Sequence, residues 1–355
     1  MRLRDAQRAD AASFGPDLGG AGGGPPEDFG DVRAEYLALR ESAGLVDRSD
    51  RDLIAVTGPD RISFLQGMVS SDVAALRPGE GQWSLLLAPQ GKLVGILRLL
   101  ATPDAVLADC DPGRGEPVAA QLQRFLVRVK TQVDEASAGW ACLSLWGPDA
   151  RRALEWAGPA ADLKAELSHR AFDGAILVHA PLPGLPGYDV LVPRAEAHQW
   201  WKRLAATVRD IGGRPAGGTA ATAVRVEAGV PLMGVDVDER TIPQEAGVVE
   251  RAVSFTKGCY VGQELVARID TRGHVNRHLR VLRLHDDVPV PLGSIVSLPG
   301  RDVGEITSVG ESLALRAPVG LALLRREAGP DAQVTVRWDG GSVAATVLEA
   351  PAVVS

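Results

Sequence analysis

The sequence predicts an α+β protein with two related sheet-and-helix modules of ferredoxin-like type, followed by a small antiparallel β-barrel. A strand–turn–helix unit occurs twice, and its Gly-Pro-Asp junctions begin at Gly58 and Gly147. Short β-rich runs separated by turns fill the last 80 residues, a pattern typical of a small barrel. The length of 355 residues suits two or three domains.

Residues 1–28 contain a Gly/Pro-rich stretch and are expected to form a disordered tail. Such a composition buries too little apolar surface to offset the entropy lost on ordering. The first module, residues 29–138, is expected to alternate helices with strands. Its expected helices cover 32–40, 62–68 and 118–129; its expected strands are 53–57 and a hairpin of 83–88 with 93–100.

The second module, residues 139–275, repeats this organisation and carries the motifs described below. Its expected strands are 142–146, 175–179 and 188–192, and its expected helices are 150–156 and 198–208. The barrel is expected over residues 276–355. Its strands are predicted at 279–284, 294–298, 305–309, 334–338 and 343–348.

Composition excludes several classes of protein. Asp and Glu outnumber Lys and Arg by 45 to 38, so a basic surface for direct nucleic-acid binding is not expected. Cys110, Cys142 and Cys259 have no paired spacing, which argues against a disulfide scaffold, a zinc ribbon and a four-thiolate iron–sulfur cluster. No apolar run is long enough to span a membrane, and the N-terminus does not read as a signal peptide. The expected location is the cytoplasm.

Two motifs dominate the second module. The first is Arg225-x-Glu227-x-Gly229, and the second is Lys257-Gly258-Cys259-Tyr260-x-Gly262-Gln263-Glu264. The second motif resembles the signature of the YgfZ-type folate-binding proteins, which are relatives of the glycine-cleavage T-protein. Further similar stretches are Gly44–Ser49, Gly58–Asp60, Phe64–Gly67, Ser71–Val73, Gln90–Lys92 and Gly304–Ser308. The resemblance covers roughly residues 29–350.

The resemblance implies a tetrahydrofolate site. It assigns Glu227, with Arg225, to the pterin ring, whose 2-amino group and ring N–H suit one carboxylate. The alternative for Glu227 is a surface glutamate or one salt-bridged to a residue such as Arg225. Gly262, Gln263, Glu264 and Arg268 are also expected at the folate site. Lys and Arg exceed acids by five between Arg251 and His285, which suits either an anionic folate tail or a solvated charged face.

Cys259 is the candidate functional thiol, with Lys257 as its neighbour. An ammonium group two residues away lowers the pKa of a thiol, and glycines keep the position accessible. The alternative is a buried structural cysteine, which is the role expected for Cys110 and Cys142. His274 and His278 have the spacing of a helical metal pair, but no acidic or thiol ligand accompanies them, so no metal site is expected.

One position departs from the family pattern. The T-protein transfers a methylene group with help from an aspartate in the first-module hairpin, and that aspartate and its neighbour fall on Gly95 and Ile96 here. The resemblance therefore implies an accessory protein rather than a classical enzyme. It would use tetrahydrofolate and one thiol to help assemble or repair iron–sulfur clusters in client enzymes, including tRNA-modifying ones, together with cluster-assembly factors. The alternative is a folate-dependent one-carbon transferase, an aminomethyltransferase or a demethylase. A third class is a binding module that senses folate.

Overall fold

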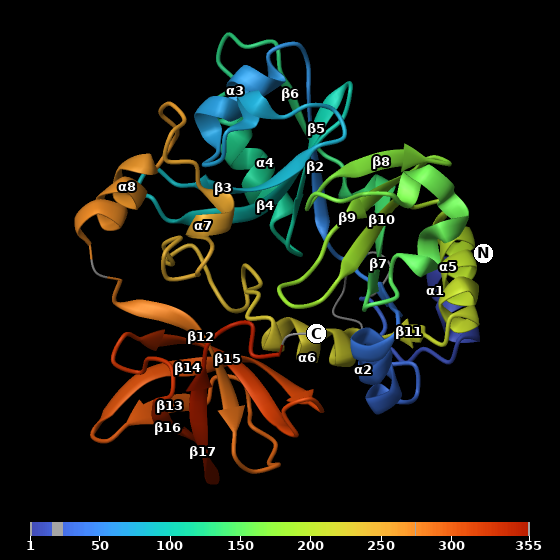
Figure 1. Cartoon of the computed structure of the whole chain (residues 1–355). Coiled ribbons are helices and arrows are strands. Elements are labelled where there is room, and N and C mark those ends of the chain that lie inside the picture. The colour runs from blue at the N-terminus through green and yellow to red at the C-terminus, as the bar shows by residue number, and fades with distance from the viewer. Residues whose placement is uncertain (1, 16–23, 274, 354–355) are drawn as a thin grey trace.

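The computed structural model describes residues 2–15, 24–273 and 275–353. Two α+β units and a β-barrel surround a common centre, and helix α6 (Gly218–Glu227) lies between the barrel and the rest of the molecule (Figure 1). This arrangement confirms the predicted fold class. None of the helices in the described residues is long and apolar enough to span a lipid bilayer.

The first sheet is antiparallel and has the strand order β3-β4-β5-β2-β6. Its strands are β2 (Asp52–Thr57), β3 (Gly81–Leu87), β4 (Leu93–Ala101), β5 (Ala105–Cys110) and β6 (Gln132–Glu135). Helices α3 (Arg61–Met68) and α4 (Gly115–Gln123), with the 3₁₀ turn η1 (Val73–Ala75), pack on one face. The apolar side chains between these layers form a core of their own, as the sequence pattern predicts.

The second sheet has the order β11-β1-β7-β10-β9-β8. Its strands are β1 (Gly44–Asp47), β7 (Trp140–Trp146), β8 (His169–Phe172), β9 (Ala175–His179), β10 (Gly187–Pro193) and β11 (Arg214–Ala216). Helix α5 (Ala197–Asp210) covers it, with the 3₁₀ segments η2 (Ser137–Gly139) and η3 (Arg152–Ala161) nearby. Strand β1 was assigned to the first module but pairs with β7 and β11. The predicted boundary at residue 138 therefore does not separate the two sheets.

The two Gly-Pro-Asp junctions adopt related turns. Gly58 and Gly147 have φ angles of 96° and 127°. A Cβ atom would lie 2.3 Å from the carbonyl oxygen of Lys130 at the first junction and 2.3 Å from that of Ser42 at the second. Both turns therefore require glycine, for backbone conformation and for close approach. This shared geometry supports the internal repeat inferred from the sequence.

The C-terminal strands form a closed barrel with the order β12-β15-β14-β13-β16-β17. They are β12 (Arg277–Leu284), β13 (Ile295–Leu298), β14 (Arg301–Ser312), β15 (Ala317–Arg325), β16 (Gln333–Trp338) and β17 (Gly341–Leu348). The sequence analysis missed β15, where Pro318 and Gly320 interrupt the strand pattern. This strand joins β12 to β14 and closes the barrel.

The N-terminal segment differs from the disordered tail predicted for residues 1–28. Helix α1 (Leu3–Ala9) packs on α5, and Ala6 joins the core of the second sheet. Gln7 donates a hydrogen bond to Asp47 at 2.6 Å, and Asp10 accepts one from the indole of Trp201 at 2.8 Å. The prediction extended the Gly/Pro character of residues 15–26 over a helix-forming stretch that precedes it. Residues 16–23 lie outside the described residues.

The segment that follows α6 also lies elsewhere than predicted. It contains α7 (Val249–Ala252) and α8 (Gln263–Arg272). The sequence analysis placed it in the second module, but its apolar side chains pack against β3 and β4 of the first sheet. The members of this contact include Leu85, Leu87, Leu93, Met233, Ala252 and Val266. Helix α2 (Val32–Glu41) packs in turn against α6 and β11.

Candidate functional site

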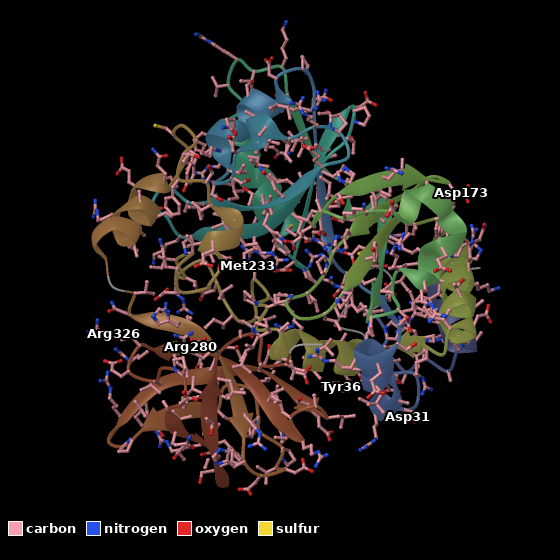
Figure 2. The ribbon with its side chains drawn as sticks, viewed as in Figure 1. Asp31, Tyr36, Asp173, Met233, Arg280 and Arg326 are labelled. Carbon is pink, nitrogen blue, oxygen red and sulfur yellow. The ribbon has the colours of Figure 1, made fainter. Side chains whose placement is uncertain are left out.

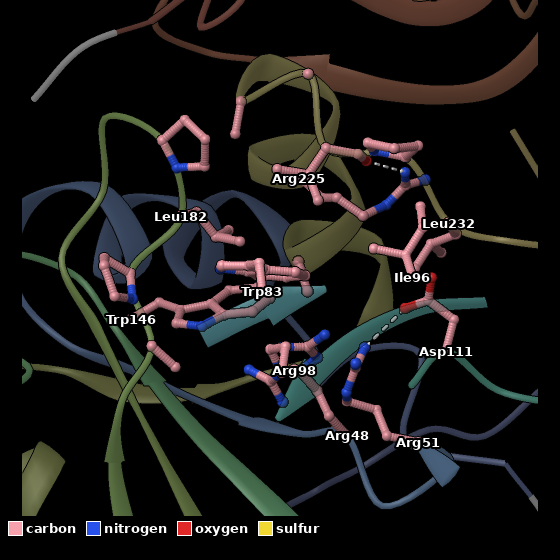
Figure 3. A pocket seen from close by; sticks show the side chains of 18 of the residues that line it. Arg48, Arg51, Trp83, Ile96, Arg98, Asp111, Trp146, Leu182, Arg225 and Leu232 are labelled. Atoms are coloured by element: carbon pink, nitrogen blue, oxygen red, sulfur yellow. Dashed lines mark hydrogen bonds and ion pairs between the residues drawn. The ribbon is translucent and has the colours of Figure 1, made fainter. Parts of the chain in front are cut away.

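A cavity of about 370 Å³ lies where the two sheets, α6 and its following segment meet. Figure 3 shows the lining side chains, which come from both sheets and from the segment that begins with α6. Trp83 and Trp146 contribute flat apolar surfaces, and five arginines contribute hydrogen-bond donors. A concave site with apolar walls and few polar groups is the usual form of a small-molecule site.

Two arginines of the cavity wall, Arg51 and Arg98, belong to a buried ionic network. Arg98 on β4 pairs with Asp109 on β5 and with Asp189 on β10, at 2.5 Å for the second pair. Arg51 also pairs with Asp109, at 2.8 Å. Burial alone raises the pKa of both carboxyls, but the neighbouring guanidinium groups outweigh it and lower the pKa of Asp109 and of Asp189. The network therefore joins the first sheet to the second with all of these groups charged.

Arg225 is the predicted site residue that lines the cavity. Its guanidinium group donates to Asp236, to the carbonyl oxygen of Val230 and to the hydroxyl of Ser308, each at 2.7 Å. Ser308 belongs to β14 of the barrel. Arg225 therefore ties α6 to the barrel and to the loop that follows α6.

Glu227 is fully buried and is not among the residues that line the cavity. Its carboxylate accepts a 2.5 Å hydrogen bond from the hydroxyl of Tyr36 and forms an ion pair with Arg40. Both partners belong to α2, and Figure 2 shows Tyr36 beside α6. Burial and the Glu227 charge raise the pKa of Tyr36. Glu227 is therefore salt-bridged, as one of the alternatives from the sequence had it, but its partner is Arg40, because Arg225 pairs with Asp236. It is not the surface glutamate of the other alternative.

The predicted residues from Lys257 to Arg268 lie in the segment of residues 254–272, here called the KGC segment. Lys257 donates to the main-chain carbonyls of Val69 and Ser71, each at 2.7 Å, just beyond the C-terminus of α3. Burial lowers the pKa of this lysine to about 8. The ammonium group therefore anchors the segment to the first module. The sequence analysis considered Lys257 only as a neighbour of Cys259, and it did not predict this contact.

Cys259 is exposed, whereas Cys110 and Cys142 are buried. Burial raises the pKa of both buried thiols far above the ordinary range. The structure therefore matches the expected contrast between one accessible cysteine and two packing cysteines.

Gly262 sets the turn into α8. Its φ is 82°, and a Cβ atom there would lie 2.5 Å from the carbonyl oxygen of Ala88. A Cβ on Gly91 would lie 2.6 Å from Cβ of Leu265, so two glycines let the segment contact the β3–β4 turn. Gln263 accepts a 3.2 Å hydrogen bond from the amide of Tyr260. Glu264 and Arg268 are exposed on α8, and none of these predicted residues lines the cavity.

Apart from Arg225, the sequence analysis did not select the arginines and tryptophans of the cavity as site residues. Arg48, Trp83 and Trp146 lie far apart in the sequence, and no local pattern connects them. The one available signal was the Gly44–Ser49 stretch, which contains Arg48 and was noted for its resemblance alone.

Strand β4 places its side chains alternately toward the cavity and toward α4. Ile96 lines the cavity, whereas a Cβ on Gly95 would lie 2.7 Å from Val118 of α4. Of the two positions where the family pattern has carboxylates, the one that faces the cavity is therefore occupied by the apolar side chain of Ile96. In the described residues, no group of three or more His, Cys, Asp or Glu side chains could hold a metal ion.

Comparison with known protein families decides the relationship. The family described as the GCVT N-terminal domain matches residues 11–257, and the glycine cleavage T-protein C-terminal barrel domain matches residues 277–353. The chain belongs to the glycine cleavage T-protein family. The predicted superfamily is thereby confirmed, while its YgfZ-type branch remains a prediction.

Curated relatives and a solved structure agree with this assignment. An aminomethyltransferase from Bordetella petrii is 30% identical over 345 residues, covering 92% of this chain and 89% of the relative. One from Rubrobacter xylanophilus is 29% identical, covering 89% and 85% of the two chains. The crystal structure of aminomethyltransferase T from Bartonella henselae has a TM-score of 0.88 at 24% identity over 99% of this chain and 97% of that chain, which shows the shared fold.

Proposed function

We propose that the protein binds tetrahydrofolate, or a one-carbon-substituted form of it, in the central cavity. The cavity itself carries this proposal: it lies between both sheets and α6 and offers Trp83, Trp146 and arginine side chains. Aromatic walls suit the pterin and aminobenzoyl rings of a folate, and the arginines suit its oxygens and carboxylates. The family to which the chain belongs supports the choice of ligand.

Calorimetric titration with tetrahydrofolate tests the proposal. Thr222 on α6 lines the cavity and Thr219 on the same helix is exposed, so the pair gives a matched comparison. Thr222→Phe fills the cavity and is expected to weaken binding by at least tenfold, about 1.4 kcal/mol. Thr219→Phe is expected to bind as the unchanged protein does. Equal affinities in the two variants would place the ligand elsewhere.

The relatives named aminomethyltransferase favour one-carbon transfer, the alternative considered in the sequence analysis, as the activity. Four carboxylates line the cavity, those of Asp47, Asp50, Asp111 and Glu166. Three of them are held: Asp47 by Gln7 and the Ser49 amide, Asp111 by Arg51 and the Met233 amide, and Glu166 by Trp83 and Arg251. A general acid or base must reach the reacting group. Because Ile96 occupies the cavity face of β4, we expect transfer from an aminomethyl-lipoyl carrier to be slower than about one turnover per second.

A turnover assay with that carrier and tetrahydrofolate measures this directly. Turnover near or above one per second would establish a transferase that uses another acid–base group. Folate binding without turnover would favour the second candidate function.

That second candidate is a YgfZ-type accessory role in iron–sulfur cluster assembly or repair, with cluster-assembly factors or client enzymes as partners. The exposed Cys259 in the KGC segment favours it, because an accessible thiol can meet a partner protein. In a strain lacking this protein, the unchanged chain should restore cluster-dependent enzyme activity, including that of tRNA-modifying enzymes, whereas Cys259→Ser should not. Full restoration by Cys259→Ser would remove the thiol from the proposal.

A further inference from the structure

Five arginines line the cavity, and one of them differs from the rest. Arg51, Arg98, Arg225 and Arg251 each form an ion pair with an aspartate or glutamate. Among the described residues, Arg48 forms no ion pair with a carboxylate and donates no side-chain hydrogen bond. Asp189 and Asp50 attract it at longer range, and the two oxygens of the Asp189 carboxylate bind Arg98 and Ser144.

The main chain and an aromatic ring hold Arg48 in place. Its amide donates to the carbonyl oxygen of Cys142 on β7 at 2.9 Å. The Asp47 carboxylate accepts from the Ser49 amide at 2.9 Å, which fixes the turn that follows β1. The guanidinium carbon lies 5.2 Å from the centroid of the Trp146 ring, within the range of a cation–π contact.

The surroundings of Arg48 favour an added negative charge. Burial lowers the pKa of Arg48, and the positive charge of Arg51 lowers it further. A carboxylate beside the guanidinium would offset both effects, because a charge-assisted pair is strong where water is partly excluded. The planar guanidinium also presents two parallel N–H donors that match the two oxygens of a carboxylate.

The proposed ligand supplies such a group at one end. The pterin ring of tetrahydrofolate carries no net charge at neutral pH, whereas its glutamate part carries two carboxylates. The one arginine of the cavity that the described residues leave without a carboxylate therefore complements the glutamate end rather than the pterin end. We propose that Arg48 binds a glutamate carboxylate of the folate, an inference that rests on folate being the ligand of the cavity.

A double-mutant-type thermodynamic cycle, in which Arg48 is changed in the protein and the carboxylates are changed in the ligand, tests the pairing. The probes are tetrahydrofolate and its derivative with both glutamate carboxylates converted to amides, and affinity is measured by calorimetry. The unchanged protein is expected to prefer the carboxylate form by about tenfold or more. Arg48→Met keeps the apolar stem over Trp146 and is expected to bind the two probes within about twofold of each other. Arg124→Met, at an exposed arginine outside the cavity, serves as the control and should keep the preference.

The outcomes separate this inference from the proposed function. If Arg48→Met still prefers the carboxylate form as strongly as the unchanged protein does, Arg48 does not bind the carboxylate. If Arg48→Met loses affinity for the amide form by the same factor, the residue contacts another part of the ligand, and the inference is again wrong. Failure of the unchanged protein to bind either probe would instead contradict the proposed function itself.

Discussion

The central cavity and the KGC segment hold their charged groups by different means. In the cavity, arginines pair with carboxylates from other elements, as Arg98 does with Asp109 and Asp189. In the KGC segment, Lys257 binds main-chain carbonyls and Gly262 permits a close backbone approach. The cavity residues are scattered between Pro25 and Pro351, whereas the KGC segment is contiguous. The contiguous KGC segment thus specifies how one stretch of chain docks on the first module. The residues that line the cavity, which a ligand can enter, are instead brought together by folding.

The largest expected effect comes from breaking the cavity network. Arg98→Met leaves Asp109 with one partner fewer and Asp189 without its guanidinium group, both in buried positions. We expect the free energy of unfolding to fall by about 3–5 kcal/mol, measured by urea denaturation. Arg301→Met removes an exposed ion pair with Glu327 and is expected to cost about 1 kcal/mol or less. A loss in Arg98→Met no larger than that of this control would show that the network does not hold the modules together.

The next effect concerns the turn of the KGC segment. Gly262→Ala places a methyl group against the carbonyl of Ala88 in a left-handed conformation, so we expect a loss of about 1–3 kcal/mol. Gly258 is the matched control, because a Cβ there has nothing within 4 Å. Hydrogen exchange should show faster exchange in residues 254–272 of the first variant alone. If Gly258→Ala speeds hydrogen exchange in the segment equally, the close approach of Gly262 to the Ala88 carbonyl is not the reason that this position requires glycine.

Lys257 gives the KGC segment a pH dependence above about pH 8. Its pKa is about 8 in the folded protein because burial disfavours the charged form, and the unfolded value is 10.5. Between these two pH values the unfolded chain keeps a proton that the folded chain has lost, so the contribution of this group to stability rises with pH. Below about pH 8 the cost of burying the charge is fully present.

The difference in unfolding free energy between the unchanged protein and Lys257→Met should therefore rise from pH 8 to pH 10.5. Urea denaturation across that range measures it, with Lys202→Met, at an exposed lysine of α5, as the control. Parallel pH profiles for the unchanged protein and Lys257→Met would contradict the lowered pKa.

The smallest effect on stability is expected at Cys259. Because this thiol is exposed, Cys259→Ser should change the free energy of unfolding by no more than about 0.5 kcal/mol. Iodoacetamide should label one cysteine in the native protein and none in Cys259→Ser, with mass spectrometry as the measurement. Labelling of Cys110 or Cys142 at a similar rate would mean that the core around them opens readily.

Local patterns predicted the elements whose periodicity is strong. The helix expected at 198–208 is α5, because Trp200, Trp201, Leu204 and Val208 recur at helical spacing on its buried face. Strand β1 gave no such pattern, since all four of its residues are buried and it is too short to show a period. Its partners, β7 and β11, lie about 100 and 170 residues away in sequence.

The candidate site was harder to predict for a physical reason. Arg225 was selected because its motif is local, and it does line the cavity. Glu227, two residues on, has its carboxylate bound by α2, and no property of the motif reveals that contact. Whether a charged side chain is paired depends on residues brought together by folding, as with Arg51 and Asp109. That Arg48 has no carboxylate in an ion pair with it among the described residues could therefore be recognised only in the folded chain.

The interior position of β1 also affects how the protein is made. Residues 52–135 contain every strand of the first sheet, so that sheet can assemble as soon as they leave the ribosome. Gly44 of β1 is translated 96 residues before Trp140 of β7, an interval of about 5 to 20 seconds at ordinary elongation rates. During this time Leu45 and Val46 lack the strand that buries them, and β11 is translated later still. The nascent chain therefore carries all strands of the first sheet beside an apolar strand whose partner strands have not yet been made.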